Sequence, residues 1–256
     1  MTYLFACGGS GGHIFPALSV AEELARRDPT SRVIYACGTK DIESAIFRVV
    51  PKDAVFTVDS APFRGGASFV DPGFLIRLAK GFFQSRALLK KLKPALVVGF
   101  GGYVSFPVLM AARSLRVRTA LHEQNVIPGR ANRVLASWVE AVALSHEETR
   151  RHFKRCQRSR VTGNPIRSSI EEDRRQEALH FFGFYQAKKI LLVLGGSQGA
   201  ESVNHLFLGA LPFLGSAAKD LVQVLHLCGR MEPRDSEEAC RRQGVSVRSF
   251  SFFDRM

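Results

Sequence analysis

Short apolar runs alternate with longer amphipathic stretches along the whole chain, and this alternation restricts the fold more than any other feature. It is the pattern of β-α-β units, in which helices cover a parallel sheet. The expected strands of the first part are Tyr3–Cys7, Arg32–Cys37, Ala54–Val58, Ala95–Gly99, Arg118–Leu121, Ala141–Leu144 and Arg158–Thr162. The expected helices are Phe15–Arg27, Phe74–Lys93, Ser105–Ser114 and Gly129–Ser137. The chain is therefore predicted to be an α/β protein.

A change in composition after Gly163-Asn164-Pro165 predicts a boundary between two domains, 1–163 and 164–256. The segment Arg167–Gln176 is polar and charged, as a linker would be. Further strands are expected at Ile190–Leu194, Leu221–Leu227 and Val245–Phe250. So small a set of strands leaves one edge and one face of a sheet poorly covered, and we therefore expect the second domain to be incomplete.

The chain is strongly basic, with 36 Lys and Arg against 23 Asp and Glu and a formal net charge of +13. Long-range attraction at this charge favours an anionic partner, which could be nucleic acid, an acidic membrane surface or a phosphorylated substrate. No motif that interleaves aromatic and basic residues supports a nucleic-acid binder. A membrane surface and a phosphorylated substrate are the partners that we expect.

The cysteine pattern and the hydropathy indicate the compartment. The chain has five cysteines and no CxxC pair, and an odd number without a secretory signal fits a reducing environment. No apolar stretch reaches the roughly 20 residues that a membrane-spanning helix needs. We therefore expect a cytoplasmic protein whose membrane contact is peripheral.

Three glycine clusters each follow an expected strand, at Gly8–His13 (GGSGGH), Gly99–Tyr103 (GFGGY) and Gly195–Ala200 (GGSQGA). Glycine lets the backbone turn sharply and approach a ligand closely, and the first N–H groups of a following helix attract an anion such as phosphate. A tight turn without a ligand explains one cluster equally well. Three clusters at the carboxyl ends of strands favour binding.

Neither of two common nucleotide-binding motifs is present. The dinucleotide fingerprint GxGxxG fails because Ile14 occupies the position of its third glycine, and the P-loop pattern GxxxxGK[ST] does not occur. Both Gly8–Gly12 and Gly195–Gly199 match the GxSxG elbow of hydrolases, which makes Ser10 and Ser197 candidate nucleophiles. A serine hydrolase is therefore an alternative interpretation.

Five segments follow one another in a fixed order: Gly8–Pro16 (GGSGGHIFP), Gly99–Ser105 (GFGGYVS), Leu121–Gly129 (LHEQNVIPG), Gly163–Arg167 (GNPIR) and Gly195–Asn204 (GGSQGAESVN). Together they closely resemble the MurG family of bacterial N-acetylglucosaminyltransferases, which complete lipid II for peptidoglycan. The resemblance implies a GT-B architecture, with two Rossmann-like parallel-sheet domains that face a cleft. It also implies UDP-N-acetylglucosamine as the donor, lipid I (undecaprenyl-pyrophosphoryl-N-acetylmuramoyl-pentapeptide) as the acceptor, and inversion at the anomeric carbon.

The resemblance also implies roles on the acceptor side. A base must remove the proton of the acceptor hydroxyl, and we assign this role to His13, with Glu123 as a second catalytic candidate. A histidine that only caps the turn is the alternative for His13. The residues implied to hold the acceptor diphosphate or to line its side of the cleft are Ser10, Gly11, Gly12, Gly101, Gly102 and Tyr103.

The residues implied to bind the donor are Asn125, Arg167, Ser197, Gln198 and Asn204, together with Ser10, Gly11 and Gly12. Arg167 offers a planar fork to phosphate oxygens, and Ser197 at a helix N-terminus favours the charge of the leaving diphosphate. The alternatives are helix capping for Asn125 and a salt bridge with Glu171 or Glu172 for Arg167. Because no DxD pair occurs, we expect no protein-held metal ion and no cofactor.

The segment Phe74–Lys93 predicts a helix with a membrane-facing side. Its apolar face, expected to dock on the sheet, consists of Phe74, Leu75, Leu78, Phe82, Leu89 and Leu92. Ile76 and Phe83 fall on the other side, flanked by Lys80, Arg86 and Lys90, and an apolar pair in a basic surround is typical of contact with anionic lipid. Scattered exposed apolar residues are the alternative interpretation. We predict a location at the cytoplasmic face of the bacterial inner membrane.

The chain departs from the family pattern in its length. The family's second domain continues beyond Phe252-Phe253-Asp254, and that continuation carries much of the uracil and ribose recognition. We therefore expect weak or absent turnover. A non-catalytic form that binds the acceptor, as a scaffold for other cell-wall enzymes, is the alternative function.

Overall fold

The computed structural model describes residues 1–39, 43, 46–62, 71–153, 156, 158–196 and 199–253. The chain divides into two compact units, Met1–Ser168 and Ser169–Met256, so the division lies slightly beyond the predicted boundary at 163. No disulfide joins the five cysteines, all of which lie among the described residues. Among the helices that the structure describes, none combines the length and apolar character needed to span a bilayer.

The described residues of the first unit form a seven-stranded sheet with the order β3-β2-β1-β4-β5-β6-β7. All neighbouring strands are parallel, and the central strand β1 pairs with both β2 and β4. The strands are β1 (Thr2–Ala6), β2 (Arg32–Cys37), β3 (Val55–Thr57), β4 (Leu96–Gly99), β5 (Thr119–Glu123), β6 (Ala141–Leu144) and β7 (Ser159–Val161). The prediction of a parallel α/β fold is confirmed, and each strand lies within two residues of its expected position.

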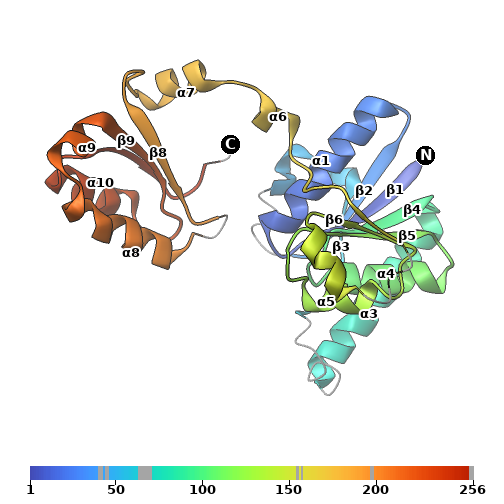
Figure 1. Cartoon of the computed structure of the whole chain (residues 1–256). Helices are drawn as coiled ribbons and strands as arrows, with labels where there is room; N and C mark the ends of the chain where they lie inside the picture. The colour runs from blue at the N-terminus through green and yellow to red at the C-terminus, as the bar shows by residue number, and fades with distance from the viewer. Residues whose placement is uncertain are drawn as a thin grey trace. The chain divides into compact units, whose positions relative to one another are not determined.

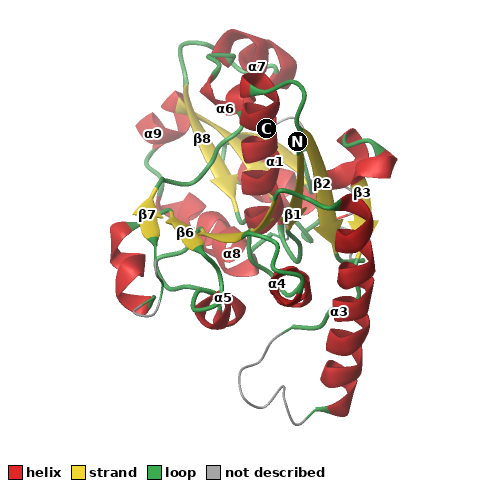
Figure 2. Ribbon diagram, turned by 90° about the vertical axis from the view of Figure 1, so that its right-hand side faces the viewer, coloured by secondary structure: helices red, strands yellow, loops and turns green. Residues whose placement is uncertain are grey.

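Helices cover both faces of this sheet (Figures 1 and 2). Successive residues of β1 point to opposite faces: Phe5 packs with Ile14 in one buried cluster, and Leu4 packs with Leu89 and Phe106 in another. The α-helices are α1 (Gly11–Arg27), α3 (Pro72–Leu92), α4 (Ser105–Ser114) and α5 (Arg130–Leu135). Shorter 3₁₀ helices are η1 (Phe47–Val49), η2 (Lys52–Ala54) and η4 (Glu147–His152).

Helix α1 begins at Gly11, one turn before the predicted start at Phe15. Glycine and proline are poor helix formers, so the sequence pattern places the start too late. In the structure Ser10 is the N-cap, and Pro16 lies inside the helix, where its ring nitrogen donates no hydrogen bond. The glycine cluster therefore supplies the first turn of the helix as well as the bend before it.

Helix α3 buries a narrower strip than its sequence predicts. Its buried positions are Phe74, Gly81, Ser85 and Leu89, whereas Leu75 is 42% exposed. The expectation that Leu75 docks on the sheet is therefore wrong, because Leu75 lies about 100° around the helix from Phe74. At Gly81 the helix backbone lies directly on the chain after β3: a Cβ there would overlap the carbonyl oxygen of Asp59.

In the second unit the described residues form a three-stranded parallel sheet with the order β10-β9-β8. The strands are β8 (Lys189–Leu194), β9 (Val222–Leu227) and β10 (Ser246–Phe250), close to their expected positions. The helices are α6 (Ser168–Glu171), which spans the division, α7 (Arg175–Phe182), α8 (Glu201–Ala210), α9 (Ser216–Leu221) and α10 (Pro233–Arg242), with the 3₁₀ helix η5 (Leu211–Phe213). The edge strand β8 exposes Leu191, Leu192 and Leu194, each by more than 40%, as expected for a sheet with a poorly covered edge.

Candidate functional site

The first glycine loop connects β1 to α1. Gly9 has φ +89°, a conformation that favours glycine, and Ser10 precedes the helix with an extended backbone. The Ser10 side chain does not cap the helix, so it is available to other partners. The first N–H groups of α1, at Gly11 and Gly12, have no acceptor within the helix, and an anion fits there.

The second glycine loop connects β4 to α4 and packs directly on the first. Gly101 and Gly102 have φ +93° and +75°, and a Cβ at Gly102 would overlap the carbonyl oxygen of Gly8. A Cβ at Gly101 would lie 2.7 Å from the His13 ring. The two predicted loops therefore come together, since β1 and β4 are neighbours in the sheet.

His13 lies where these loops meet a pocket of about 200 Å³, the first-unit pocket, which is lined by His13, Pro62, Gly102, Tyr103, Glu123, Gly129, Arg130, Ala131 and Asn132. Its Nδ1 is 3.1 Å from Ser10 Oγ. Burial lowers the pKa of the His13 imidazole from its ordinary value, and the Glu123 carboxylate and a hydrogen bond with the Gly8 backbone oppose this effect. Because the net shift is downward, the ring is neutral at pH 7 and can accept a proton.

Glu123 ends β5, is 1% exposed, and has both carboxylate oxygens occupied. Oε1 accepts the backbone and side-chain N–H groups of Asn125, each at 3.0 Å. Oε2 accepts the Gly129 N–H at 3.1 Å and the Asn132 side chain at 2.8 Å. The Glu123 carboxylate thus accepts hydrogen bonds from several positions of the loop 123–132 and stabilises its conformation. This geometry favours a positioning role for Glu123 over proton transfer. The catalytic role of Glu123 stays a prediction.

The neighbours of Glu123 also bind within the unit. His122 Nε2 is 3.2 Å from the Gly163 carbonyl oxygen, and Gln124 donates to the Phe100 carbonyl at 2.8 Å. The exposed Asn125 donates its side-chain N–H to Glu123, and the N-cap of α5 is Gly129, so the structure does not show the helix capping that is the alternative for Asn125. Its role in donor binding stays a prediction.

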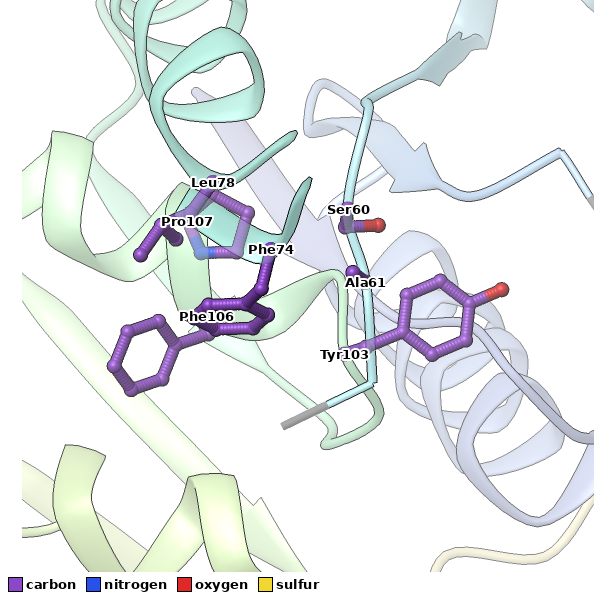
Figure 3. A pocket seen from close by; sticks show the side chains of 7 residues that line it. All are labelled: Ser60, Ala61, Phe74, Leu78, Tyr103, Phe106 and Pro107. Atoms are coloured by element: carbon purple, nitrogen blue, oxygen red, sulfur yellow. The ribbon is translucent and has the colours of Figure 1, made fainter. Parts of the chain in front are cut away.

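Tyr103 borders two pockets from the second loop. Its ring lines the first-unit pocket and also a small apolar pocket with Phe74, Leu78 and Phe106 (Figure 3). Its hydroxyl points away from these apolar side chains and donates to Glu43 Oε1 at 3.1 Å. The hydroxyl is therefore engaged by Glu43, and Tyr103 lines the first-unit pocket.

Sequence reasoning missed two residues of this site, Glu43 and Asn132. Glu43 lies outside every motif, and Asn132 lies shortly after the LHEQNVIPG segment, which ends at Gly129. Asn132 is 2% exposed and donates to Glu123, while its Oδ1 has no hydrogen-bond partner among the described residues. For Asn132, the signal available in the sequence was a polar residue close to the LHEQNVIPG motif.

Arg167 lies in the first unit, after β7. Its guanidinium stacks on the ring of Phe15 in α1, 4.7 Å from the ring centroid. Cation–π stacking restricts the orientation of the planar group. The arrangement is compatible with the predicted role in binding a phosphate, which stays a prediction.

On the donor side, Ser197 and Gln198 lie outside the described residues. Asn204 is 2% exposed, and its amide is used inside the second unit: Nδ2 donates to the Cys228 carbonyl at 2.8 Å, and Oδ1 is 2.9 Å from His226 Nε2. His226 Nδ1 in turn is 2.7 Å from Ser236 Oγ. Asn204 therefore joins α8 to the end of β9, and its donor-binding role stays a prediction.

A second-unit pocket of about 470 Å³ opens above this network, lined by Gly199, Ala200, Glu201, Ser202, Asn204, Cys228, Arg230 and Met231. Gly199 has φ +72°, and a Cβ there would lie 2.7 Å from Gly229. The third glycine loop thus packs closely on the loop after β9, beside the N-terminus of α8. Among the described residues, no group of His, Cys, Asp and Glu is arranged to hold a metal ion.

The predicted membrane residues lie on the outer side of α3. Ile76 is 67% exposed and Phe83 65% exposed. Lys80 forms an ion pair with Asp59 at 2.6 Å, and Arg86 donates to Ser114 Oγ, whereas Lys90 extends from the exposed side. An exposed apolar pair with nearby cations is present as the sequence pattern indicates, and membrane contact itself stays a prediction.

The hydrolase interpretation finds little support at Ser10. A Ser–His contact exists, but Ser10 has φ −161° and a relaxed extended backbone, whereas the nucleophile of a GxSxG elbow occupies a strained turn. The nearest carboxylate of the pocket, Glu123, is occupied by its own loop. The second candidate nucleophile, Ser197, lies outside the described residues.

Comparison with known families gives matches to both units. Residues 3–144 match the glycosyltransferase family 28 N-terminal domain, and residues 190–256 match the glycosyltransferase family 28 C-terminal domain. A protein of Halothermothrix orenii is 35% identical over 260 residues, covering 100% of this chain and 68% of its own length. A protein of Geobacter metallireducens is 37% identical over 266 residues, covering 100% and 69%. Both are named UDP-N-acetylglucosamine–N-acetylmuramyl-(pentapeptide) pyrophosphoryl-undecaprenol N-acetylglucosamine transferase.

Solved structures share the fold. MurG of Acinetobacter baumannii matches with a TM-score of 0.66 at 22% identity, covering 99% of this chain and 67% of that one. The UDP-GlcNAc 2-epimerase of Neisseria meningitidis, solved with UDP-GlcNAc bound, matches with a TM-score of 0.67 at 13% identity, covering 99% and 73%. The chain thus spans about two thirds of the length of these proteins.

Proposed function

Because this chain belongs to glycosyltransferase family 28 and, within it, to the MurG N-acetylglucosaminyltransferases, we propose that it transfers N-acetylglucosamine from UDP-N-acetylglucosamine to lipid I. The product is lipid II, the disaccharide precursor of peptidoglycan. The observation that carries the proposal is the identity of 35% with a transferase of this name along the full length of the chain.

In the proposed reaction the acceptor hydroxyl oxygen attacks the anomeric carbon of the donor sugar. A C–O bond to the acceptor forms as the bond between the sugar and UDP breaks, with inversion, and UDP leaves with the bonding electron pair. His13 takes the hydroxyl proton. Its neutral state at pH 7 and its place on the first-unit pocket suit this role.

The acceptor diphosphate is proposed to lie over the glycine loops of the first unit. The N–H groups of Gly11 and Gly12 at the start of α1 provide donors, and Ser10 adds a hydroxyl next to His13. Gly101 and Gly102 allow the second loop to approach closely, and Tyr103 forms a wall of the pocket.

The donor is proposed to bind to the second unit, at the loop before α8, and the donor contacts of Arg167 and Asn125 stay predictions. The closely packed glycine turn at Gly199 and the pocket beside it support this assignment. We propose no protein-held metal ion, so chelation with EDTA should leave the rate of transfer unchanged. Retention of less than half of the activity in EDTA would contradict this part of the proposal.

We further propose that α3 brings the protein to the anionic inner surface of the bacterial membrane, where lipid I is found. The exposed Ile76 and Phe83 would enter the interface, and Lys80, Arg86 and Lys90 would attract the headgroups. The net charge of +13 acts in the same direction.

The direct test is transfer of labelled N-acetylglucosamine from UDP to a lipid I analogue by this chain, with a full-length relative as the positive control. Formation of the disaccharide supports the proposal, even at a low rate. Acceptor binding without transfer would instead support the scaffold alternative. Covalent labelling of Ser10 by a fluorophosphonate would revive the hydrolase.

A further inference from the structure

A buried carboxylate lies between the two glycine loops of the first unit. Glu43 is 1% exposed, and its Oε1 accepts both the Gly9 N–H and the Tyr103 O–H. The two donors come from different loops, far apart in the sequence. One oxygen atom therefore connects the first glycine loop to the second.

The loops accommodate this carboxylate because they carry glycine at the contact positions. A Cβ at Gly8 would lie 2.7 Å from Glu43 Oε1, and a Cβ at Gly38 would lie 2.7 Å from Glu43 Oε2. At Gly9 the backbone has φ +89°, and a Cβ would lie 3.1 Å from the Tyr103 ring. A side chain at Gly8 or Gly38 would therefore displace the carboxylate from its two donors.

Two acidic groups next to Glu43 have raised pKa values. Burial raises the pKa of the Tyr103 hydroxyl, and the Glu43 charge and its hydrogen bond raise it further. Burial also raises the pKa of the Cys37 thiol to about 12, again with a contribution from Glu43. These neighbours therefore stay protonated, and Tyr103 remains a donor to Glu43 at any physiological pH.

The hydrogen bonds to Glu43 decide which polar groups of the loops can meet a ligand. The Gly9 N–H and the Tyr103 hydroxyl are both engaged, and the hydroxyl points away from the apolar pocket (Figure 3). The next N–H groups along the chain, at Gly11 and Gly12, begin α1 and have no acceptor within it. The Tyr103 ring remains on the wall of the first-unit pocket.

From this arrangement we infer that Glu43 is a positioning residue for the lipid-linked acceptor: it fixes the first glycine loop and the Tyr103 ring in the arrangement that receives the acceptor diphosphate. The inference rests on the proposed function. Glu43 is buried, and its contacts with Gly9 and Tyr103 are the ones through which we expect it to act. A carboxylate suits the task because a charged acceptor forms stronger hydrogen bonds than a neutral one, and one oxygen holds both donors.

The first test is kinetic. Glu43→Ala should lower kcat/KM for a lipid I analogue on the order of 100-fold, because the loop that holds the diphosphate loses its alignment. The loss should appear mainly in the KM for the acceptor, and the KM for UDP-N-acetylglucosamine should stay within about twofold. Glu43→Gln keeps an oxygen acceptor at the same place and should restore activity to within about tenfold of the unaltered chain.

The matched control is Glu140→Ala, which removes an exposed carboxylate paired with Arg118 in the same unit and should behave as the unaltered chain. Tyr103→Phe removes one of the two donors and should raise the acceptor KM by less than Glu43→Ala, which keeps the test open if the alanine variant does not fold. Equal losses for both substrates, with Glu43→Gln as impaired as Glu43→Ala, would overturn the inference.

The second test does not depend on catalysis, so it separates a failure of this inference from a failure of the proposed function. In protein labelled with ¹⁵N-glycine, the Gly9 amide proton should resonate downfield and move upfield in Glu43→Ala. Inorganic pyrophosphate should shift the Gly11 and Gly12 amides of the unaltered chain and bind at least tenfold more weakly to the alanine variant. A Gly9 amide and a pyrophosphate affinity that are both unaffected by Glu43→Ala would overturn the role of Glu43, whatever the transfer assay shows.

Discussion

The two units carry similar glycine motifs, GGSGG and GGSQG, but arrange their histidines in opposite ways. His13 in the first unit lines a pocket and is 3.1 Å from one hydroxyl, that of Ser10. His226 in the second unit is 0% exposed, and both of its nitrogens are within hydrogen-bond distance of buried partners, Ser236 and Asn204. We therefore predict that the surroundings of each histidine decide its role, which is proton transfer for His13 and packing for His226.

The largest expected effect tests the proposed proton transfer by His13. His13→Ala should lower kcat for transfer by about 10²–10⁴-fold, since it removes the proposed base. The melting temperature should change little because the ring is only partly buried. Steady-state kinetics with labelled donor, alongside thermal unfolding, measure both quantities. A kcat within tenfold of the unaltered chain would remove His13 from the chemistry.

The pH profile sharpens the same prediction. Burial holds the pKa of His13 below its ordinary value of 6.5, so the neutral base persists at pH 7 and is lost only as the pH falls through that lowered pKa. We therefore expect kcat to be level near neutral pH and to decline on the acid side. An acid limb above pH 7 would contradict this assignment.

Removing the centre of the loop 123–132 should have the next largest effect. Glu123→Ala leaves the amide groups of Asn125, Gly129 and Asn132 without their common acceptor, and we expect the first unit to lose about 3 kcal/mol of stability. Urea unfolding followed by the fluorescence of Trp138 reports on this unit. Glu140→Ala, which removes an exposed carboxylate, is the control. Full stability together with lost activity would instead favour direct catalysis by Glu123.

The exposed side of α3 should give a moderate effect. Phe83→Ser combined with Lys90→Glu should weaken binding to anionic vesicles by about tenfold or more, since it removes an apolar anchor and reverses a charge. Co-sedimentation with vesicles containing phosphatidylglycerol measures the change. The same substitutions should leave transfer to a water-soluble acceptor unchanged. Equal co-sedimentation of the altered and unaltered chains would contradict membrane contact through α3.

The smallest expected effect tests the packing role of His226. Burial lowers the pKa of His226, so the unfolded chain binds more protons than the folded one at acid pH, and stability is lost as the pH falls below about 6.5 toward the lowered pKa. Amide hydrogen exchange in β9 should therefore become faster at pH 5.5 than at pH 7.5, after correction for the intrinsic rate. His226→Gln should reduce that difference, and an equal pH dependence in both chains would contradict it.

The sequence predicts the framework of the first unit well because the framework depends on local patterns. Buried apolar runs predict the strand positions to within two residues, and the glycines after β1 and β4 predict the two glycine loops. The helix pattern fails in detail where a residue lies at the margin of the buried strip, as Leu75 does. The predicted start of α1 is one turn too late, because the first turn of the helix contains glycines, which are poor helix formers.

The site is predictable only in part, because Glu43 acquires its role from sheet topology. The strand order β2-β1-β4 places the chain after β2 on one side of the first glycine loop and Tyr103 on the other, which gives Glu43 both of its donors. No spacing within the sequence encodes that meeting. Asn204 acquires a packing contact that its motif does not predict, since its amide joins α8 to the end of β9, and its donor-binding role stays a prediction.

The contact at Gly81 has a consequence for how α3 meets its surroundings. The helix backbone rests on the Asp59 carbonyl with no room for a methyl group, so α3 cannot roll about its axis without separating from the chain that leads to Pro62 and the first-unit pocket. The rotational setting of the helix is thereby fixed from its inner side. The smallest residue on the buried side of α3 thus decides which residues the helix turns to the outside.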